Sequence, residues 1–267
     1  MKKRFIKYTA IFSVVLLMVG CSTVPIIGRK QLSLIDDNQI QAQAAVAYNN
    51  FLGSAETRVV TGTSDATMVK NVGHKIASAV NQFLRQNNLG DQYDFNWEFN
   101  LIQSDEVNAW CMPGGKVAVY TGILPLTYNE SGLATVMGHE IAHAIARHSM
   151  EQMSNQYAAQ ALGAAIGVST SGSKWGALIN SAYGLGGQVA LLSYSRKNES
   201  EADRLGLIFM AMAGYNPEEA VTFWQRMASA KSSANNPPEF LSSHPSDQRR
   251  VNDLKKLIPE ARQYYKR

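Results

Sequence analysis

Hydrophobic and polar residues follow two different spacings along the chain, one of three to four residues and one of two. From Asp36 to about residue 48, and again over about 64–87, apolar residues recur every three or four positions, which predicts two amphipathic helices. Residues 94–102 (DFNWEFNLI) instead alternate between apolar and polar, and residues 116–120 follow a Pro-Gly-Gly turn. Both segments are therefore predicted to be strands.

The second half of the chain has a mainly helical pattern and no fixed-period repeat. The pattern predicts a long helix over about 129–152, a helix over about 199–213 ended by Gly214, one that starts at Asn216-Pro217, and two short ones that begin near Ser246 and Pro259. Residues 161–190, rich in Gly, Ala and Ser, predict two closely packed helices joined by a loop at 168–173, and residues 235–238 break the chain. The expected fold is one mostly helical domain with a small sheet.

The net charge of +4 comes from the first twenty residues. Four of the 25 basic residues lie there and no acidic one does, so the remainder carries 21 of each sign. A basic start followed by the apolar run 8–20 is typical of a secretory signal peptide. That run of 13 residues is shorter than the roughly 20 that a membrane-spanning helix needs, which disfavours an uncleaved anchor. A neutral remainder without a basic stripe also disfavours nucleic-acid binding.

The signal-like segment ends Met18-Val19-Gly20-Cys21, which resembles a bacterial lipobox and predicts a lipid on Cys21. The alternative is a secreted protein in which this cysteine is incidental. Only one other cysteine exists, Cys111, so a disulfide-stapled domain is excluded. Cys111 is expected to be a partly buried strand residue. We therefore expect a signal peptide over 1–20, a lipid-anchored tether over 21–35 and one domain over 36–267.

The motif His139-Glu140-Ile141-Ala142-His143 lies inside the predicted long helix. Histidines at i and i+4 share a helix face and can grip one metal ion. Glu140 lies between them and can act as general base toward an attacking water. The apolar residues around the motif would desolvate the site, unlike a surface helix that merely contains histidines.

A catalytic zinc ion commonly has a third protein ligand. The metzincin pattern would require glycine at Ala146 and histidine at Ser149, and His148 stands one residue too early. The third ligand is therefore expected to be a carboxylate on a later helix. Glu199 and Glu201 are the candidates.

Glu199 and Asp203 form an ExxxD pattern after HExxH, which resembles the zinc metalloproteases that include the CAAX prenyl protease, HtpX, BepA and LoiP. The resemblance implies that Glu199 is the third zinc ligand and that Asp203 orients a ligand histidine. Glu201 then becomes a solvated helix residue. His148 and His74 are expected to be a helix-end and a helix-surface residue without a role at the site.

Two further segments resemble this family. Residues 108–115 (NAWCMPGG) match its NAxxxPGG edge strand and turn, which implies substrate contacts by Asn108, Ala109, Trp110, Pro113 and Gly114 through strand addition. His244-Pro245 and Arg250 match its HPxxxxR element. That match implies catalytic roles for His244 and Arg250. His244 would lie near the metal, either stabilising the oxyanion or filling the fourth ligand position in a resting state.

The resemblance covers about residues 24–257 and is closest in layout to LoiP-like lipoprotein peptidases, because no membrane-spanning helix follows the signal and no helical-repeat domain follows the HPxxxxR element. It implies an α+β, predominantly α-helical zincin-like domain whose small sheet carries the substrate edge strand.

The implied function is a one-zinc endopeptidase of extended or misfolded proteins, concerned with protein quality control in the bacterial cell envelope. Cys21 would anchor it by lipid, on the inner face of the outer membrane in a two-membrane bacterium. A chaperone-like or autoinhibited binding module on the same fold is the alternative, and a structural metal protein is a second.

Overall fold

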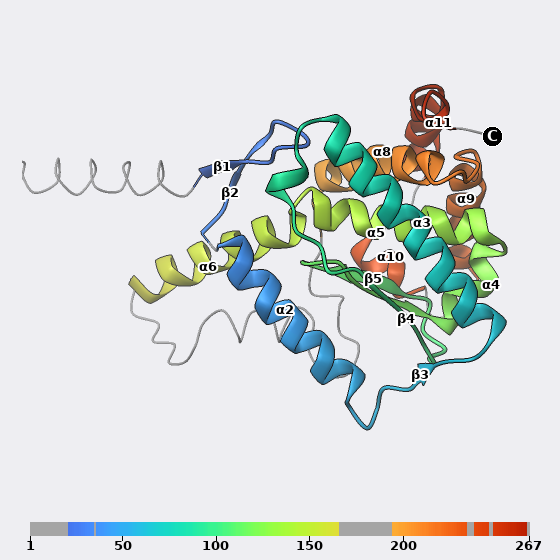
Figure 1. Ribbon diagram of the computed structural model, residues 1–267, viewed down its shortest axis with the longest axis horizontal. Coiled ribbons are helices and arrows are strands. Elements are labelled where there is room, and N and C mark those ends of the chain that lie inside the picture. The colour runs from blue at the N-terminus through green and yellow to red at the C-terminus, as the bar shows by residue number, and fades with distance from the viewer. Residues whose placement is uncertain (1–20, 35, 166–193, 234–237, 246–247, 266–267) are drawn as a thin grey trace, which may run out of the picture.

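The computed structural model describes residues 21–34, 36–165, 194–233, 238–245 and 248–265. Figure 1 shows a helix-rich molecule with a small sheet among its helices. The helices are α2 Asp37–Leu52, α3 Ser64–Gln86, α4 Leu124–Thr127, α5 Glu130–Ile145, α6 His148–Ala165, α8 Arg196–Met212, α9 Glu219–Ser233, α10 Phe240–Ser243 and α11 Gln248–Arg262, with short 3-10 turns at Gly90–Gln92 and Thr121–Ile123. The strands are β1 Cys21–Thr23, β2 Lys30–Leu32, β3 Val59–Val60, β4 Glu98–Ile102, β5 Ala109–Met112 and β6 Lys116–Tyr120. The predicted α+β, mainly helical class is confirmed.

The main sheet has the strand order β3-β4-β6-β5, so β5 is an edge strand. Strand β6 pairs in parallel with β4 and antiparallel with β5. The β5–β6 turn has a hydrogen bond from the Gly115 N–H to the Met112 carbonyl, 3.1 Å long. Gly114 and Gly115 have φ values of 85° and 87°, a region that favours glycine, which explains the Pro-Gly-Gly sequence.

Successive side chains of a strand point to opposite sides of the sheet, and both sides are covered by helices. In β6, Val117 and Val119 join the larger core with α3, α5 and α8, while Ala118 and Tyr120 join a smaller core. The smaller core is formed with α2 and includes Trp110 and Met153, among other residues. Figure 1 places α3, α5 and α8 together on one side of the sheet.

Helices α5 and α8 cross at a point of very close backbone contact between Gly138 and Gly206. A Cβ atom added to Gly206 would lie 3.0 Å from the backbone carbon of Gly138 and from the backbone nitrogen of His139. Only a residue without a side chain fits there without moving one of the helices. The two glycines therefore allow α8 to pack closely against α5 beside the metal-binding motif.

The predicted single helix over 129–152 is two helices in the structure. Helix α5 ends at Ile145 and α6 starts at His148, because Arg147 adopts a left-handed conformation with φ 57°. The two short helices predicted near 246 and 259 are instead one helix, α11, with Pro259 inside it. Its buried stripe of Val251, Leu254, Ile258 and Ala261 continues through the exposed Pro259, so packing holds the helix together.

Two other regions differ from the expected pattern. The expected strand at 94–102 is shorter, with pairing only over Glu98–Ile102. The expected irregular tether contains the antiparallel β1–β2 hairpin, and the segment after it docks on α6, where the Leu34 N–H donates to Ser154 Oγ at 3.1 Å. The predicted signal peptide, the loop at 168–173 and the break at 235–237 lie outside the described residues. Within the described part of the chain, no helix is both long and apolar enough to cross a membrane.

Candidate active site

Helix α5 carries both histidines of the HExxH motif on one face. Its first turn is capped by the side chain of Asn129, which accepts a hydrogen bond from the Gly132 N–H at 2.8 Å. His139 and His143 are both buried, and their Nε2 atoms lie 3.0 Å apart. The i, i+4 spacing therefore aims two imidazole nitrogens at one point, as the motif predicts.

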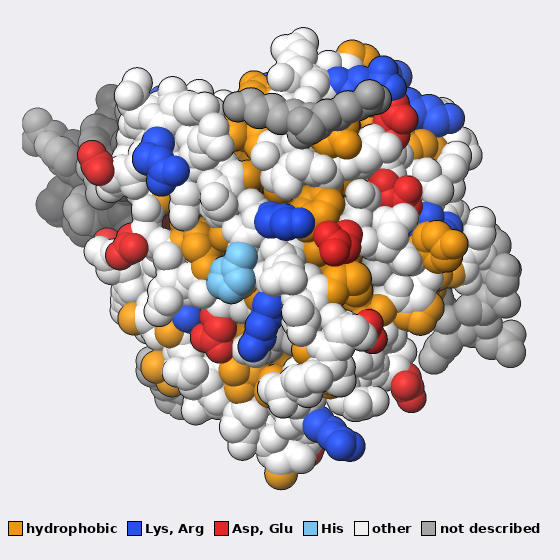
Figure 2. All heavy atoms as spheres, turned by 45° about the vertical axis from the view of Figure 1, so that its right-hand side comes forward, with side chains coloured by type: hydrophobic (Ala, Val, Ile, Leu, Met, Phe, Trp, Pro, Cys, Tyr) orange, Lys and Arg blue, Asp and Glu red, His pale blue; other side chains and the backbone are white. Residues whose placement is uncertain are grey.

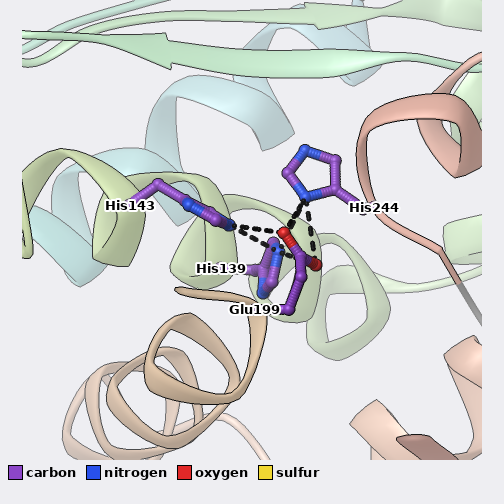
Figure 3. Close-up of side chains that lie close together, drawn as sticks. All are labelled: His139, His143, Glu199 and His244. Carbon is purple, nitrogen blue, oxygen red and sulfur yellow. Dashed lines mark hydrogen bonds and ion pairs between the residues drawn. The ribbon is translucent and has the colours of Figure 1, made fainter. Parts of the chain in front are cut away.

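Glu199 reaches the same point from the first turn of α8. Ser195 and Asn198 form a capping box that fixes the start of this helix. The Glu199 carboxylate lies 3.3 Å from His143 Nε2 and 3.5 Å from His139 Nε2. Figure 3 shows the three side chains converging.

A fourth donor comes from His244, which directly follows α10. Its Nδ1 atom lies 3.1 Å from His139 Nε2 and 3.1 Å from a Glu199 carboxylate oxygen. Four donors about 2.0–2.2 Å from a zinc ion form a tetrahedron with edges of about 3.3–3.6 Å. Five of the six separations between donors are 3.0–3.5 Å, within a few tenths of an ångström of this, and all four donor atoms lie within 4.8 Å of one another, so the four buried side chains fit one zinc ion.

The charge states of two of the donors, His143 and Glu199, also suit a metal ion. Burial lowers the pKa of His143 well below its usual value, which leaves the imidazole neutral and able to coordinate. Burial opposes ionisation of Glu199, but the neighbouring imidazoles of His244, His139 and His143 outweigh it and hold the pKa of Glu199 well below its usual range. The site therefore presents an anionic carboxylate among imidazole nitrogens.

Glu140 lies beside the donor set without belonging to it. Its Oε1 atom is buried, has no hydrogen-bond partner among the described residues, and lies 3.4 Å from His244 Nε2. Burial raises the pKa of Glu140, partly offset by the charges of His244 and His139. A raised pKa and an oxygen close to the donors that makes no hydrogen bond are the properties expected of a general base.

Asp203 and Arg250 lie behind the donors. An Asp203 oxygen is 3.1 Å from His139 Nδ1, on the side of the ring opposite the metal-binding nitrogen. Arg250 donates to Asp203 at 2.6 and 2.9 Å and to Glu199 at 2.8 Å, with its guanidinium 3.5 Å over the Trp224 ring. Asp203 thus lies where the resemblance implies. Arg250 binds the carboxylates of the site and holds them in place.

His148 is a neighbour of the site that the sequence analysis missed. Its ring is buried, with Nδ1 2.9 Å from His143 Nδ1 and Nε2 3.1 Å from Glu201. In one continuous helix, position 148 would point roughly 140° away from position 143. The break at Arg147 reorients it, and Glu201, expected to be solvated, is its partner. The only signal in the sequence was a third histidine within two turns of HExxH.

The structure does not bring all the expected substrate-binding residues to the site. The Trp110 side chain is buried on the α2 face of the sheet, where its ring meets Tyr48 and Phe51 at centroid distances of 5.8 and 5.2 Å. Ala109 and Cys111 point to the opposite face, toward α5. The period-2 alternation of a strand separates them.

The remaining candidates have ordinary structural positions. Asn108 is buried and its side chain accepts a hydrogen bond from the Ala109 N–H at 2.9 Å, while Pro113 and Gly114 form the turn. Burial, reinforced by the charge of Glu140, raises the pKa of the Cys111 thiol well above its usual value, so this thiol is unsuited to nucleophilic attack. His74 is exposed on α3, as expected.

The model of Peptidase family M48 matches residues 69–258, which include the HExxH motif, both carboxylates of ExxxD and His244. The chain belongs to Peptidase family M48. This is a family of zinc-dependent metallopeptidases, so the predicted resemblance and zincin-like fold are confirmed, and the four buried donors are a group that could hold the predicted single zinc ion.

Relatives of this M48 chain come from mitochondria and bacteria. The mitochondrial metalloendopeptidase OMA1 of Schizosaccharomyces pombe is 40% identical over 63% of the chain and 48% of its own length. OMA1 of Bos taurus is 31% identical over 91% of the chain and 46% of its own length, and the β-barrel assembly-enhancing protease of Escherichia coli is 30% identical over 62% and 35%. The chain thus spans half or less of the length of these relatives.

Proposed function

We propose that this M48 chain is a zinc endopeptidase that cleaves extended or unfolded polypeptides close to a membrane. The observation that carries the proposal is the convergence of His139, His143 and Glu199 next to the buried Oε1 of Glu140, which has no hydrogen-bond partner among the described residues. Three buried ligands and an adjacent base are the minimum set for hydrolysis of a peptide bond in this way.

The chain's own residues divide the work of hydrolysis among them. A bound zinc ion supplies a Lewis acid that acidifies the attacking water and polarises the scissile carbonyl. Glu140 Oε1 accepts the proton from that water and then delivers it to the departing amine. Asp203 accepts a hydrogen bond from the Nδ1–H of His139, which holds the ring in the tautomer that leaves Nε2 free to coordinate. Arg250 keeps Asp203 and Glu199 ionised and in position.

Strand β5 offers its open edge to a substrate. The Tyr120 N–H donates to the Asn108 carbonyl at 3.0 Å, so in this antiparallel ladder Trp110 and Met112 also turn their main-chain groups inward to β6. The groups of Ala109 and Cys111 then face outward, on the edge next to α5. We infer that an extended peptide pairs with β5 along this edge. Such pairing recognises the main chain of the peptide more than its side chains.

For location, we propose that the chain is exported and that lipid on Cys21 holds the domain of residues 36–267 at the envelope membrane of a bacterium, on the inner face of the outer membrane where there are two. Supporting this are the lipobox-like sequence and the exposed position of Cys21 at the start of β1. The name of one relative, a β-barrel assembly-enhancing protease, also fits a role in envelope quality control. Figure 2 shows basic side chains dispersed among acidic ones on one face, which fits a partner other than nucleic acid.

Removal of zinc from the purified full-length protein is expected to abolish cleavage of an unfolded protein such as casein. Without the metal ion the site has no Lewis acid, and Glu140 alone does not activate water. The measurement is the initial cleavage rate before chelation, after dialysis against a chelator, and after return of one equivalent of Zn²⁺. Undiminished cleavage by the zinc-free protein would refute the proposal.

The second candidate function, an autoinhibited module, is favoured by one specific observation. His244 Nδ1 takes a corner of the donor tetrahedron, and His139, Glu140, His143 and Glu199 are all buried. A zinc site with four protein ligands is typical of a closed, non-catalytic site. We propose that this is a resting state of the peptidase, in which His244 must leave the donor set before a substrate enters.

Replacement of His244 by alanine is therefore expected to increase the cleavage rate of the purified protein by about tenfold or more, because a minor open state is populated at about 0.1–10%. Zinc should remain bound by the three other ligands, which metal analysis of the dialysed protein checks. His74→Ala, on the exposed face of α3, is the matched control. A lower rate in His244→Ala would instead assign His244 to oxyanion stabilisation.

A further inference from the structure

A chain of buried polar contacts links the metal ligand His143 to the N-terminal hairpin. His143 Nδ1 meets His148 Nδ1 at 2.9 Å, and His148 Nε2 meets Glu201 at 3.1 Å. Arg29, which directly precedes β2, donates from Nε to the same Glu201 oxygen at 3.1 Å. Four residues from three separate parts of the sequence thus form one continuous path that ends at the metal site.

One placement of protons satisfies every contact in this path. His143 must keep Nε2 unprotonated to coordinate, so its proton lies on Nδ1 and is donated to His148. His148 accepts at Nδ1, and its own proton on Nε2 is donated to the Glu201 carboxylate. His139 donates its Nδ1 proton in the same way, but directly to the carboxylate of Asp203. Between His143 and the carboxylate of Glu201, the imidazole of His148 is interposed.

Arg29 fixes the far end of the path between two helices. Besides Glu201 on α8, its guanidinium donates to Glu151 on α6 at 2.8 Å, and its side chain is only 10% exposed. Glu151 in turn accepts from Asn198 at 3.2 Å, next to the ligand Glu199. A planar guanidinium can bridge two carboxylates in this way, and the point charge of a lysine cannot reproduce it.

We propose that Arg29, Glu201 and His148 are positioning residues for zinc, a relay that orients the ligand His143 and makes the hairpin of residues 21–32 a part of the metal site. The proposal rests on the zinc site of the proposed function but not on proteolysis. It gives the segment that follows Cys21 a role in metal binding, beyond that of a tether. Residues that orient a metal ligand typically contribute 10–100-fold to metal affinity.

The test is the zinc affinity of the full-length protein, measured by titrating the zinc-free protein with Zn²⁺ against a chromophoric chelator. We expect affinity to fall about 10–100-fold in His148→Leu and about tenfold in Arg29→Leu and Glu201→Gln, with partial recovery in Arg29→Lys. Arg226→Leu is the matched control, because Arg226 also bonds a carboxylate, Glu219 at 2.8 Å, but packs against α4. Its affinity should equal that of the wild type.

A double-mutant cycle separates a relay from general loosening of the fold. Once His148 is leucine, the path is cut, so a further Arg29→Leu change should weaken zinc binding less than about twofold. Additive losses in the double variant, or wild-type affinity in all three single variants, would overturn the proposal. Glu201→Gln keeps the side-chain shape, and the thermal unfolding of each zinc-free variant shows that it is folded. Failure of the wild type to bind zinc would instead refute the proposed function.

Discussion

The Glu140→Gln variant is expected to lose about 10²–10⁴-fold in kcat toward an unfolded protein substrate, the range that a positioned general base contributes. Glutamine has nearly the same shape, but its amide cannot accept the proton of the attacking water. Since Glu140 lies outside the set of four donors, zinc should bind with its normal stoichiometry. The measurements are the saturating cleavage rate and the zinc content of the same preparation.

Stability supplies an internal check on the Glu140→Gln variant. Burial raises the pKa of Glu140, which means that the ionised carboxylate is disfavoured in the folded protein. A neutral amide should therefore leave the free energy of unfolding unchanged or slightly higher. Glu130→Gln, the same change at the start of the same helix, is the control and should cleave at the wild-type rate. Equal turnover by the Glu140 variant and the wild type would eliminate Glu140 as the base.

Replacement of Arg250 by leucine is expected to cost about 3–5 kcal/mol of stability in the zinc-free protein, since it removes the guanidinium that compensates two buried carboxylates. Arg250 makes bidentate contact with Asp203 and a further bond of 2.8 Å to Glu199. Each acid is less than 10% exposed. Urea unfolding of the zinc-free variant and wild type measures the difference.

The comparison for Arg250 comes from the same pair of helices. Arg204 of α8 bonds Glu260 of α11, but the Arg204 side chain is 51% exposed. Because water screens such a pair, Arg204→Leu should cost less than about 1 kcal/mol. The Arg250→Lys variant keeps the positive charge but loses the planar guanidinium with its paired N–H donors. Its loss of stability should lie between those of Arg204→Leu and Arg250→Leu. Similar losses in Arg204→Leu and Arg250→Leu would contradict the idea that Arg250 compensates buried charge.

Local patterns in the sequence were enough to predict the catalytic core. The i, i+4 histidines and the ExxxD spacing are relations within one helix, and the rise and turn of a helix fix them whatever surrounds it. Strand β6 and the edge strand with its Pro-Gly-Gly turn are equally local. These features allowed His139, Glu140, His143 and Glu199 to be named in advance.

Two predictions depended on which face of a strand a side chain occupies or on whether a helix continues, and the structure differs from both. The resemblance to the NAxxxPGG edge strand implies a substrate contact by Trp110, yet its side chain lies on the α2 face of the sheet. His148 is expected to be a helix-end residue without a role at the site, but the left-handed Arg147 breaks the helix and the His148 ring contacts His143. A non-glycine residue in this conformation leaves almost no trace in the sequence.

By itself, then, the sequence determined which residues are the candidate donors and the candidate base, because short-range helical geometry specifies their spacing. The tertiary structure alone decided how they are held. The close contact of Gly138 with Gly206 sets α8 against α5, and the path from Arg29 to His143 joins residues more than a hundred positions apart. Such contacts arise when whole helices and strands pack together, and the spacing of residues within a single helix or strand does not reveal them.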